Sequence, residues 1–157
     1  MPNGMENDKI NYSVTLGNEN HAKLQDILEL YAKLFEDADL NFFKERYASH
    51  PKLISVLAYN NETLVGFKIG YPYNETTFYS WIGGVLPHYR QRGIANTLAQ
   101  YQESAAKSQG FKTLRTKSMN RFKPMMILNL KREFNIINIY TNTKGQTKIV
   151  FEKSLTD

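Results

Sequence analysis

The chain has 157 residues and carries 20 lysines and arginines against 15 aspartates and glutamates, a formal charge of +5. This length and a 41% hydrophobic composition predict one globular domain over residues 1–157 and exclude disordered and collagen-like proteins. Because there is no cysteine, disulfide scaffolds, thiolate metal sites and thiol catalysis are excluded. No apolar run reaches the ~20 residues of a membrane helix, so we expect a cytoplasmic protein, with a flexible N-terminus over 1–10.

The first half of the chain predicts a strand, two helices and then three strands. Asp39 is the expected cap of the second helix, and Pro51 follows its end. Asn60-Asn61 predicts a tight turn between two strands, since asparagine tolerates positive φ. Gly83-Gly84 indicates either a bulge or a close approach to the backbone. These elements are expected at 12–16, 21–35, 40–47, 53–59, 62–71 and 76–86.

The second half predicts a long helix, a strand, a short helix and a closing hairpin. Asn120 is the expected cap of the short helix, with Pro124 in its first turn, where a missing N–H does no harm. The elements are expected at 90–108, at 112–118, after Asn120, and at 134–141 and 146–153. The long helix should bury a stripe formed by Ile94, Leu98, Tyr101 and Ala105. The order predicts a mixed central sheet with helices on both faces.

Positive charge is concentrated beside the start of the long helix. Residues 76–132 hold ten basic side chains and one acid, Glu103, whereas residues 1–75 hold eleven acids and seven bases. Such a block is typical either of a solvated surface or of binding to an anion, which is a nucleic acid or a phosphorylated small molecule. The small residues Gly93 and Ala95 would let an anion approach the unpaired N–H groups of the first turn. The alternative for these two residues is ordinary tight packing.

Arg90-x-x-Gly93-x-Ala95 resembles the Q/R-x-x-G-x-G/A signature of the GNAT superfamily of N-acetyltransferases, and the strand and helix order over residues 12–153 is similar too. The resemblance implies the α/β GNAT fold. It also implies transfer of an acetyl group from acetyl-CoA to an amine acceptor, which is a small molecule or a peptide. With no cysteine and no evident Ser/His pair, we expect direct attack by the amine without an acetyl-enzyme. Homodimers are common in the family.

The same resemblance assigns residues to the cofactor. Backbone amides of the signature segment would bind the pyrophosphate, and the end of the preceding strand would pair with the pantetheine arm. A bulge at Gly83-Gly84 would open a wedge between two strands, and a backbone N–H near Val85 would polarise the thioester. The residues implied are Val85, Leu86, Pro87, Arg90, Gln91, Arg92, Gly93, Ile94, Ala95, Asn96 and, after the next strand, Asn120.

The proton-transfer groups depart from the family pattern. The position of its frequent acid tyrosine holds Asn129, and the position of its glutamate holds Tyr79, which is the candidate catalytic residue. With a pKa near ~10, Tyr79 would serve as an acid, orient a water or line the pocket. Tyr79 and Trp81 should face one side of their strand together, within either an acceptor pocket or the core. The three histidines have no metal-ligand spacing, so no metal is expected.

Two other functions stay open from the sequence. The missing acid and base favour a non-catalytic module of the same fold that binds acyl-CoA. The basic block favours a nucleic-acid-binding domain, although Phe122 is the one aromatic residue among the cations of 112–132, so support for base stacking is thin. The acidic first 75 residues favour a cationic or amine acceptor.

Overall fold

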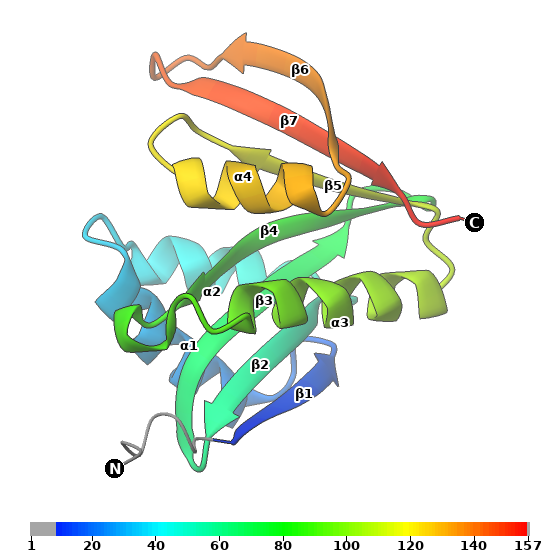
Figure 1. Cartoon of the computed structure of the whole chain (residues 1–157). Helices are drawn as coiled ribbons and strands as arrows, with labels where there is room; N and C mark the ends of the chain where they lie inside the picture. Colours follow the sequence, from blue (N-terminus) through cyan, green and yellow to red (C-terminus); the bar gives the residue numbers. More distant parts are fainter. Residues whose placement is uncertain (1–8, 157) are drawn as a thin grey trace.

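The computed structural model describes residues 9–156, which form one mixed seven-stranded sheet in the order β1-β2-β3-β4-β5-β7-β6 (Figure 1). Neighbouring strands run antiparallel except β4 and β5, which are parallel. The strands are β1 (Ile10–Leu16), β2 (Ile54–Asn60), β3 (Thr63–Pro72), β4 (Thr77–Val85), β5 (Thr113–Ser118), β6 (Asn135–Thr141) and β7 (Thr147–Ser154). The helices are α1 (His21–Leu34), α2 (Leu40–Ala48), α3 (Ile94–Ser108) and α4 (Lys123–Lys131).

The helices cover both faces of the sheet, as the sequence predicts. Figure 1 shows α3 and α4 side by side on the near face, with α1 and α2 behind the sheet. The rear core packs Ile27 and Phe43 of these two helices against Phe67 of β3, whereas Ile94 and Leu98 of α3 pack on the front face. The order of strands and helices and the mixed sheet are therefore confirmed.

Local signals explain several boundaries. The Asp39 side chain accepts a hydrogen bond from the Phe42 backbone N–H at 3.0 Å, which confirms it as the cap of α2. Asn61 has a φ of 55° in the turn between β2 and β3, as the Asn60-Asn61 pair predicts. Of the N-terminal segment expected to be flexible, residues 1–8 lie outside the described residues, and Ile10 begins β1. Within residues 9–156, no helix is long and apolar enough to cross a membrane.

The long helix differs from the prediction at its start and on its buried face. It begins at Ile94 instead of Arg90, because a 3-10 turn occupies Pro87–Tyr89 and Gln91 takes a left-handed φ of 62°. Tyr101 is 42% exposed and stacks on Tyr12 of β1 with ring centroids 5.3 Å apart, whereas Gln102 is fully buried. The helix therefore turns Gln102 toward the sheet, although a polar side chain would be expected to face solvent.

The predicted cap of α4 is wrong. Phe122 occupies the N-cap position without a side-chain hydrogen bond, and the Asn120 carbonyl instead accepts one from the Lys123 ammonium. Pro124 does lie in the first turn, as predicted.

Candidate functional site

The parallel strands β4 and β5 separate halfway along their length. They pair only from Thr77 with Thr113 to Ser80 with Thr116, so the later residues of both strands have no partner across this boundary. The β3–β4 register shifts here too, because Ile69 pairs with Ile82 and Gly70 with Ser80, which leaves Trp81 as the extra residue. The result is a wedge that opens toward the carboxyl ends of β4 and β5.

The bulge is therefore not at Gly83-Gly84, where the sequence analysis expected it, but at Trp81. The other interpretation of these glycines is correct. A Cβ on Gly84 would lie 2.7 Å from Leu34 Cδ1, and a Cβ on Gly83 would lie 2.9 Å from the Phe67 carbonyl oxygen. Both glycines let neighbouring groups approach the backbone closely.

The N-terminus of α3 lies just beyond the open end of this wedge and lacks a side-chain cap. Its N-cap is Gly93, with a φ of 80°, whereas α1 and α2 are capped by Asn20 and Asp39. A Cβ on Gly93 would meet no atom within 4 Å. The first-turn N–H groups of a helix have no partner within the helix, and the helix dipole adds partial positive charge there. This arrangement suits an anion such as a phosphate.

Side chains of the signature segment brace the turn that leads into α3. Arg90 Nε donates to the Val85 carbonyl oxygen at 3.0 Å, and Arg92 Nη2 donates to the His88 carbonyl oxygen at 2.7 Å. The Arg92 guanidinium also lies 4.8 Å from the Tyr89 ring centroid. The two arginines therefore hold the backbone of the turn and concentrate positive charge beside it. Asn120 is exposed in the turn between β5 and α4.

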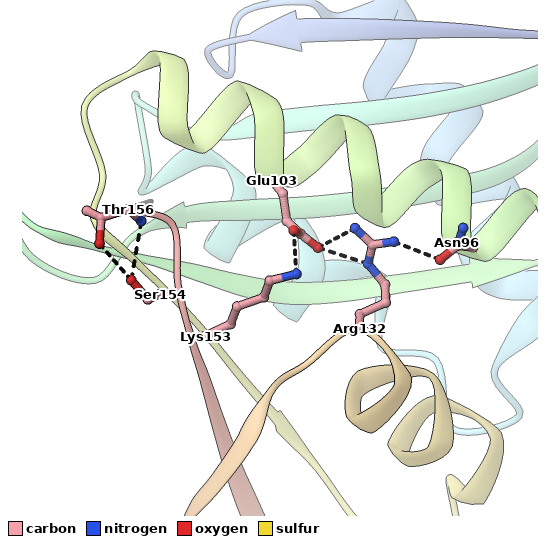
Figure 2. Close-up of polar contacts among 6 residues, drawn as sticks. All are labelled: Asn96, Glu103, Arg132, Lys153, Ser154 and Thr156. Atoms are coloured by element: carbon pink, nitrogen blue, oxygen red, sulfur yellow. Dashed lines mark hydrogen bonds and ion pairs between the residues drawn. The ribbon is translucent and has the colours of Figure 1, made fainter.

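A polar network that the sequence analysis missed joins α3, α4 and β7 (Figure 2). The Glu103 carboxylate accepts from Arg132 Nε at 2.8 Å and Nη2 at 2.6 Å, and it pairs with Lys153 Nζ at 2.7 Å. Arg132 Nη1 donates to Asn96 Oδ1 at 2.7 Å, which ties the first turn of α3 to the end of α4. An open hollow of about 370 Å³ borders the network. The sequence does contain one signal for this network, because Glu103 is the single acid of residues 76–132.

Lys68 lies beside this network on the α3 side of β3. The pKa of its ammonium is lowered from 10.5 to about 8, mainly by burial and also by the charge of Arg132, whereas Glu103 raises it. Lys68 lines a small space between the sheet and the helices together with Gln102 and Asn129. The Gln102 amide is fully buried, and neither its nitrogen nor its oxygen has a hydrogen-bond partner within the described chain. Polar groups are therefore buried between the sheet and the helices on this face.

We expect Lys68 to make stability depend on pH. Its pKa is lower in the folded chain, so between about pH 8 and 10.5 the unfolded chain binds more protons at this residue and the free energy of unfolding rises with pH. From pH 8 to 10, wild type should gain about 2 kcal/mol relative to Lys68→Met. Urea unfolding measures the difference, with the exposed Lys112→Met as control. Parallel curves for wild type and Lys68→Met would contradict the lowered pKa of Lys68.

Tyr79, the candidate catalytic residue, lies on the opposite side of the sheet. Burial raises the pKa of its hydroxyl to about 12, with Tyr71 and Tyr140 raising it and Arg46 lowering it. Tyr79 is therefore protonated at neutral pH, so its hydroxyl can donate a hydrogen bond but cannot serve there as a base. Its ring centroid lies 5.5 Å from that of Tyr71, which is 6.1 Å from that of Trp81. Tyr79 and Trp81 thus face one side together, as expected.

Comparisons with known proteins agree with this geometry. The acetyltransferase (GNAT) family matches residues 22–122, more than half of the chain. Among solved structures, an aminoglycoside 6'-N-acetyltransferase complexed with coenzyme A has a TM-score of 0.76 at 17% identity, over 92% of this chain and 98% of the other. Ard1 from Thermoplasma volcanium has a TM-score of 0.77 at 14% identity, over 93% and 99% of the two chains.

A further solved structure, Arabidopsis thaliana NAA60 in complex with acetyl-CoA, has a TM-score of 0.76 at 16% identity, over 93% of this chain and 98% of the other. A search of curated proteins finds no match. At these identities the solved structures establish the fold, and the family match covers the signature segment and the wedge. The chain belongs to the GNAT family of acetyltransferases.

Proposed function

We propose that this protein is an N-acetyltransferase that moves an acetyl group from acetyl-CoA to an amine. The observation that carries the proposal is the uncapped N-terminus of α3, with open space at Gly93, at the wide end of the β4–β5 wedge. Solved structures of the same fold contain coenzyme A or acetyl-CoA. A wedge of unpaired strand backbone next to a helix N-terminus suits a molecule with a polar amide arm and a pyrophosphate.

Each part of the site has a proposed task. The pyrophosphate would bind the first-turn N–H groups of α3, beside the charges of Arg90 and Arg92. The pantetheine arm would pair with the free backbone edge at the end of β4, and Asn120 would contact the cofactor from the far side of the wedge. The segment comprises Val85, Leu86, Pro87, Arg90, Gln91, Arg92, Gly93, Ile94, Ala95 and Asn96.

The proposed reaction is direct attack of a neutral amine on the thioester carbonyl. A C–N bond forms and the C–S bond breaks. The amine loses one proton, and the leaving thiolate gains one to become the free thiol. A backbone N–H near Val85 would stabilise the developing oxyanion. Tyr79 can donate a hydrogen bond from its protonated hydroxyl, while the Asn129 position supplies no acid. Catalysis would then rest mainly on placement of the amine against the thioester.

Isothermal titration with acetyl-CoA, followed by detection of the released thiol over a panel of amines, tests this proposal. We expect micromolar binding and thiol release with at least one amine. Absence of binding at high micromolar acetyl-CoA would refute both the enzyme and the alternative, an acyl-CoA-binding module. That alternative is favoured by Asn129 and by the neutral Tyr79, and tight binding without thiol release over the whole panel would support it. A cytoplasmic location and a homodimer remain part of the proposal.

A further inference from the structure

A cluster of rings and cations lies where β4 and β5 separate, on the face opposite α3. We call it the cationic aromatic cluster. Trp81 and Lys117 are the residues that directly follow the last pair, Ser80 with Thr116, on the two strands. Phe43 of α2 packs on the Trp81 ring at 4.7 Å, which places the cluster on the α1–α2 side of the sheet. The members are Arg46, His50, Tyr71, Tyr79, Trp81 and Lys117.

The four rings of the cluster pack against one another. His50 stacks on Tyr71 with centroids 3.6 Å apart and an interplanar angle of 10°. The Tyr71 ring contacts Tyr79 edge-on at 5.5 Å and Trp81 at 6.1 Å, so Tyr71 joins the other three rings. All four residues are half-buried. Half-buried aromatic rings supply apolar contact area at low cost in side-chain entropy.

Two cations flank these rings from different elements. Arg46 of α2 holds its guanidinium carbon 5.4 Å from the Trp81 ring centroid. Lys117 of β5 holds its ammonium 5.9 Å from the Tyr79 ring centroid and 5.4 Å from that of Tyr140. Arg46 acts on the pKa of His50, Tyr71 and Tyr79 alike, so its charge reaches across the cluster.

The two cations have no carboxylate partner in the part of the chain that the structure describes. Within residues 9–156, neither Arg46 nor Lys117 has an acidic side chain within ion-pair distance. Arg115, on the same face of β5, differs because it pairs with Glu152. Two cations over half-buried rings without a counter-ion create a positive potential that an anionic ligand would satisfy.

We infer that the amine acceptor of this enzyme carries a carboxylate and an apolar or aromatic body, and that Arg46 and Lys117 bind the carboxylate. The inference rests on the proposed function, because it places the acceptor beside the separated strands. It replaces the cationic acceptor expected from the acidic first 75 residues. Three of the described acids of that segment are engaged elsewhere: Asp39 caps α2, Asp26 accepts from the Tyr59 hydroxyl, and Asp37 faces Arg121.

Matched acceptor pairs test the inference. The probes are 4-(aminomethyl)benzoate against 4-(aminomethyl)benzamide and L-phenylalanine against L-phenylalaninamide, with putrescine as a cationic acceptor. A peptide with a free N-terminus and an acidic side chain, beside its neutral analogue, separates a peptide source of the carboxylate from a small molecule. We expect kcat/KM to be about tenfold to a hundredfold higher for the carboxylate of each pair. A preference for putrescine or for the amides would overturn the inference.

A binding measurement keeps the test independent of catalysis. Trp81 is the single tryptophan of the chain, so its fluorescence reports ligands at the cluster. With acetyl-CoA or coenzyme A present, the benzoate should change this fluorescence at a lower concentration than the benzamide. A protein that binds acetyl-CoA and the benzoate but transfers nothing would defeat the proposed enzyme and leave the binding inference standing. Equal affinity for both probes would defeat the inference alone.

Charge-removing variants complete the test. Arg46→Gln and Lys117→Gln should each raise KM for the carboxylate probes about tenfold and leave KM for the matched amides nearly unchanged. Lys112→Gln is the control, because it removes an exposed cation at the other end of β5. An equal loss for carboxylates and amides in the two cluster variants would show a merely structural role, and an unchanged KM would show no role at all.

Discussion

Gly70→Ala is expected to lower the free energy of unfolding by about 3 kcal/mol, the upper end of what overpacking usually costs. Gly70 pairs with Ser80 at the point where the β3–β4 register shifts. A Cβ there would lie 2.5 Å from the Tyr79 carbonyl oxygen and would overlap the Phe78 ring. The carbonyl belongs to a paired strand and Phe78 is fully buried, so neither can move without disturbing the bulge. Urea unfolding measures the loss.

Gly66→Ala is the matched control for Gly70→Ala, since it adds the same methyl group to the same strand. Its Cβ would meet Ile94 Cγ2 and Leu98 Cδ1 at 3.3 Å, which is a smaller overlap than at Gly70 and involves side-chain methyl groups instead of a backbone carbonyl. We expect a cost of about 1 kcal/mol or less. Equal losses in the two variants would mean that crowding at the bulge is not what requires glycine at position 70.

Gly70 also links packing to the candidate site. Its missing side chain lets β4 lie close to β3 at Tyr79. Gly70 pairs with Ser80, and the extra residue Trp81 comes directly after Ser80. The same point ends the pairing of β4 with β5. The crowded spot at Gly70, the register shift and the start of the wedge therefore coincide in the sheet. A folded Gly70→Ala protein should show altered Trp81 fluorescence before any ligand is added.

The element order could be predicted because periodicity and turn chemistry act locally. Asp39 caps α2 through its own side chain, and Asn61 adopts the positive φ of its turn whatever the rest of the chain does. The signature segment could be assigned for the same reason, since a strand, a turn with Gly93 and a helix lie within a few residues. These features need no knowledge of distant contacts.

The bulge, the helix face and the charges could not be predicted, because they depend on residues far apart in the sequence. Gly83-Gly84 is a reasonable bulge signal, but the crowding around Gly70 decides the register shift. Gln102 is polar, yet the packing of α3 on the sheet buries it. Net charge by segment does not say where single charges lie, whereas the fold places Arg46 of the acidic segment over the Trp81 ring and Lys117 of the basic one over the Tyr79 ring.

Gly93→Ala is expected to weaken acetyl-CoA binding about tenfold to a hundredfold while costing only about 1 kcal/mol of stability. The backbone at Gly93 has a φ of 80°, which strains any residue with a Cβ, but that Cβ would meet no protein atom within 4 Å. If the pyrophosphate binds the first turn of α3, the added methyl group would occupy space that the phosphate oxygens need. Isothermal titration measures the affinity and urea unfolding the stability.

Gly145→Ala separates the backbone strain at Gly93 from the loss of ligand space. Gly145 has a φ of 78°, its Cβ would also meet nothing within 4 Å, and it lies in the β6–β7 turn. Both variants should therefore lose similar stability, and only Gly93→Ala should lose affinity for acetyl-CoA. Unchanged affinity in Gly93→Ala would place the pyrophosphate elsewhere, and the uncapped helix would then be an ordinary solvated end. If both variants lost affinity for acetyl-CoA, the loss would come from lowered stability and not from the space at Gly93.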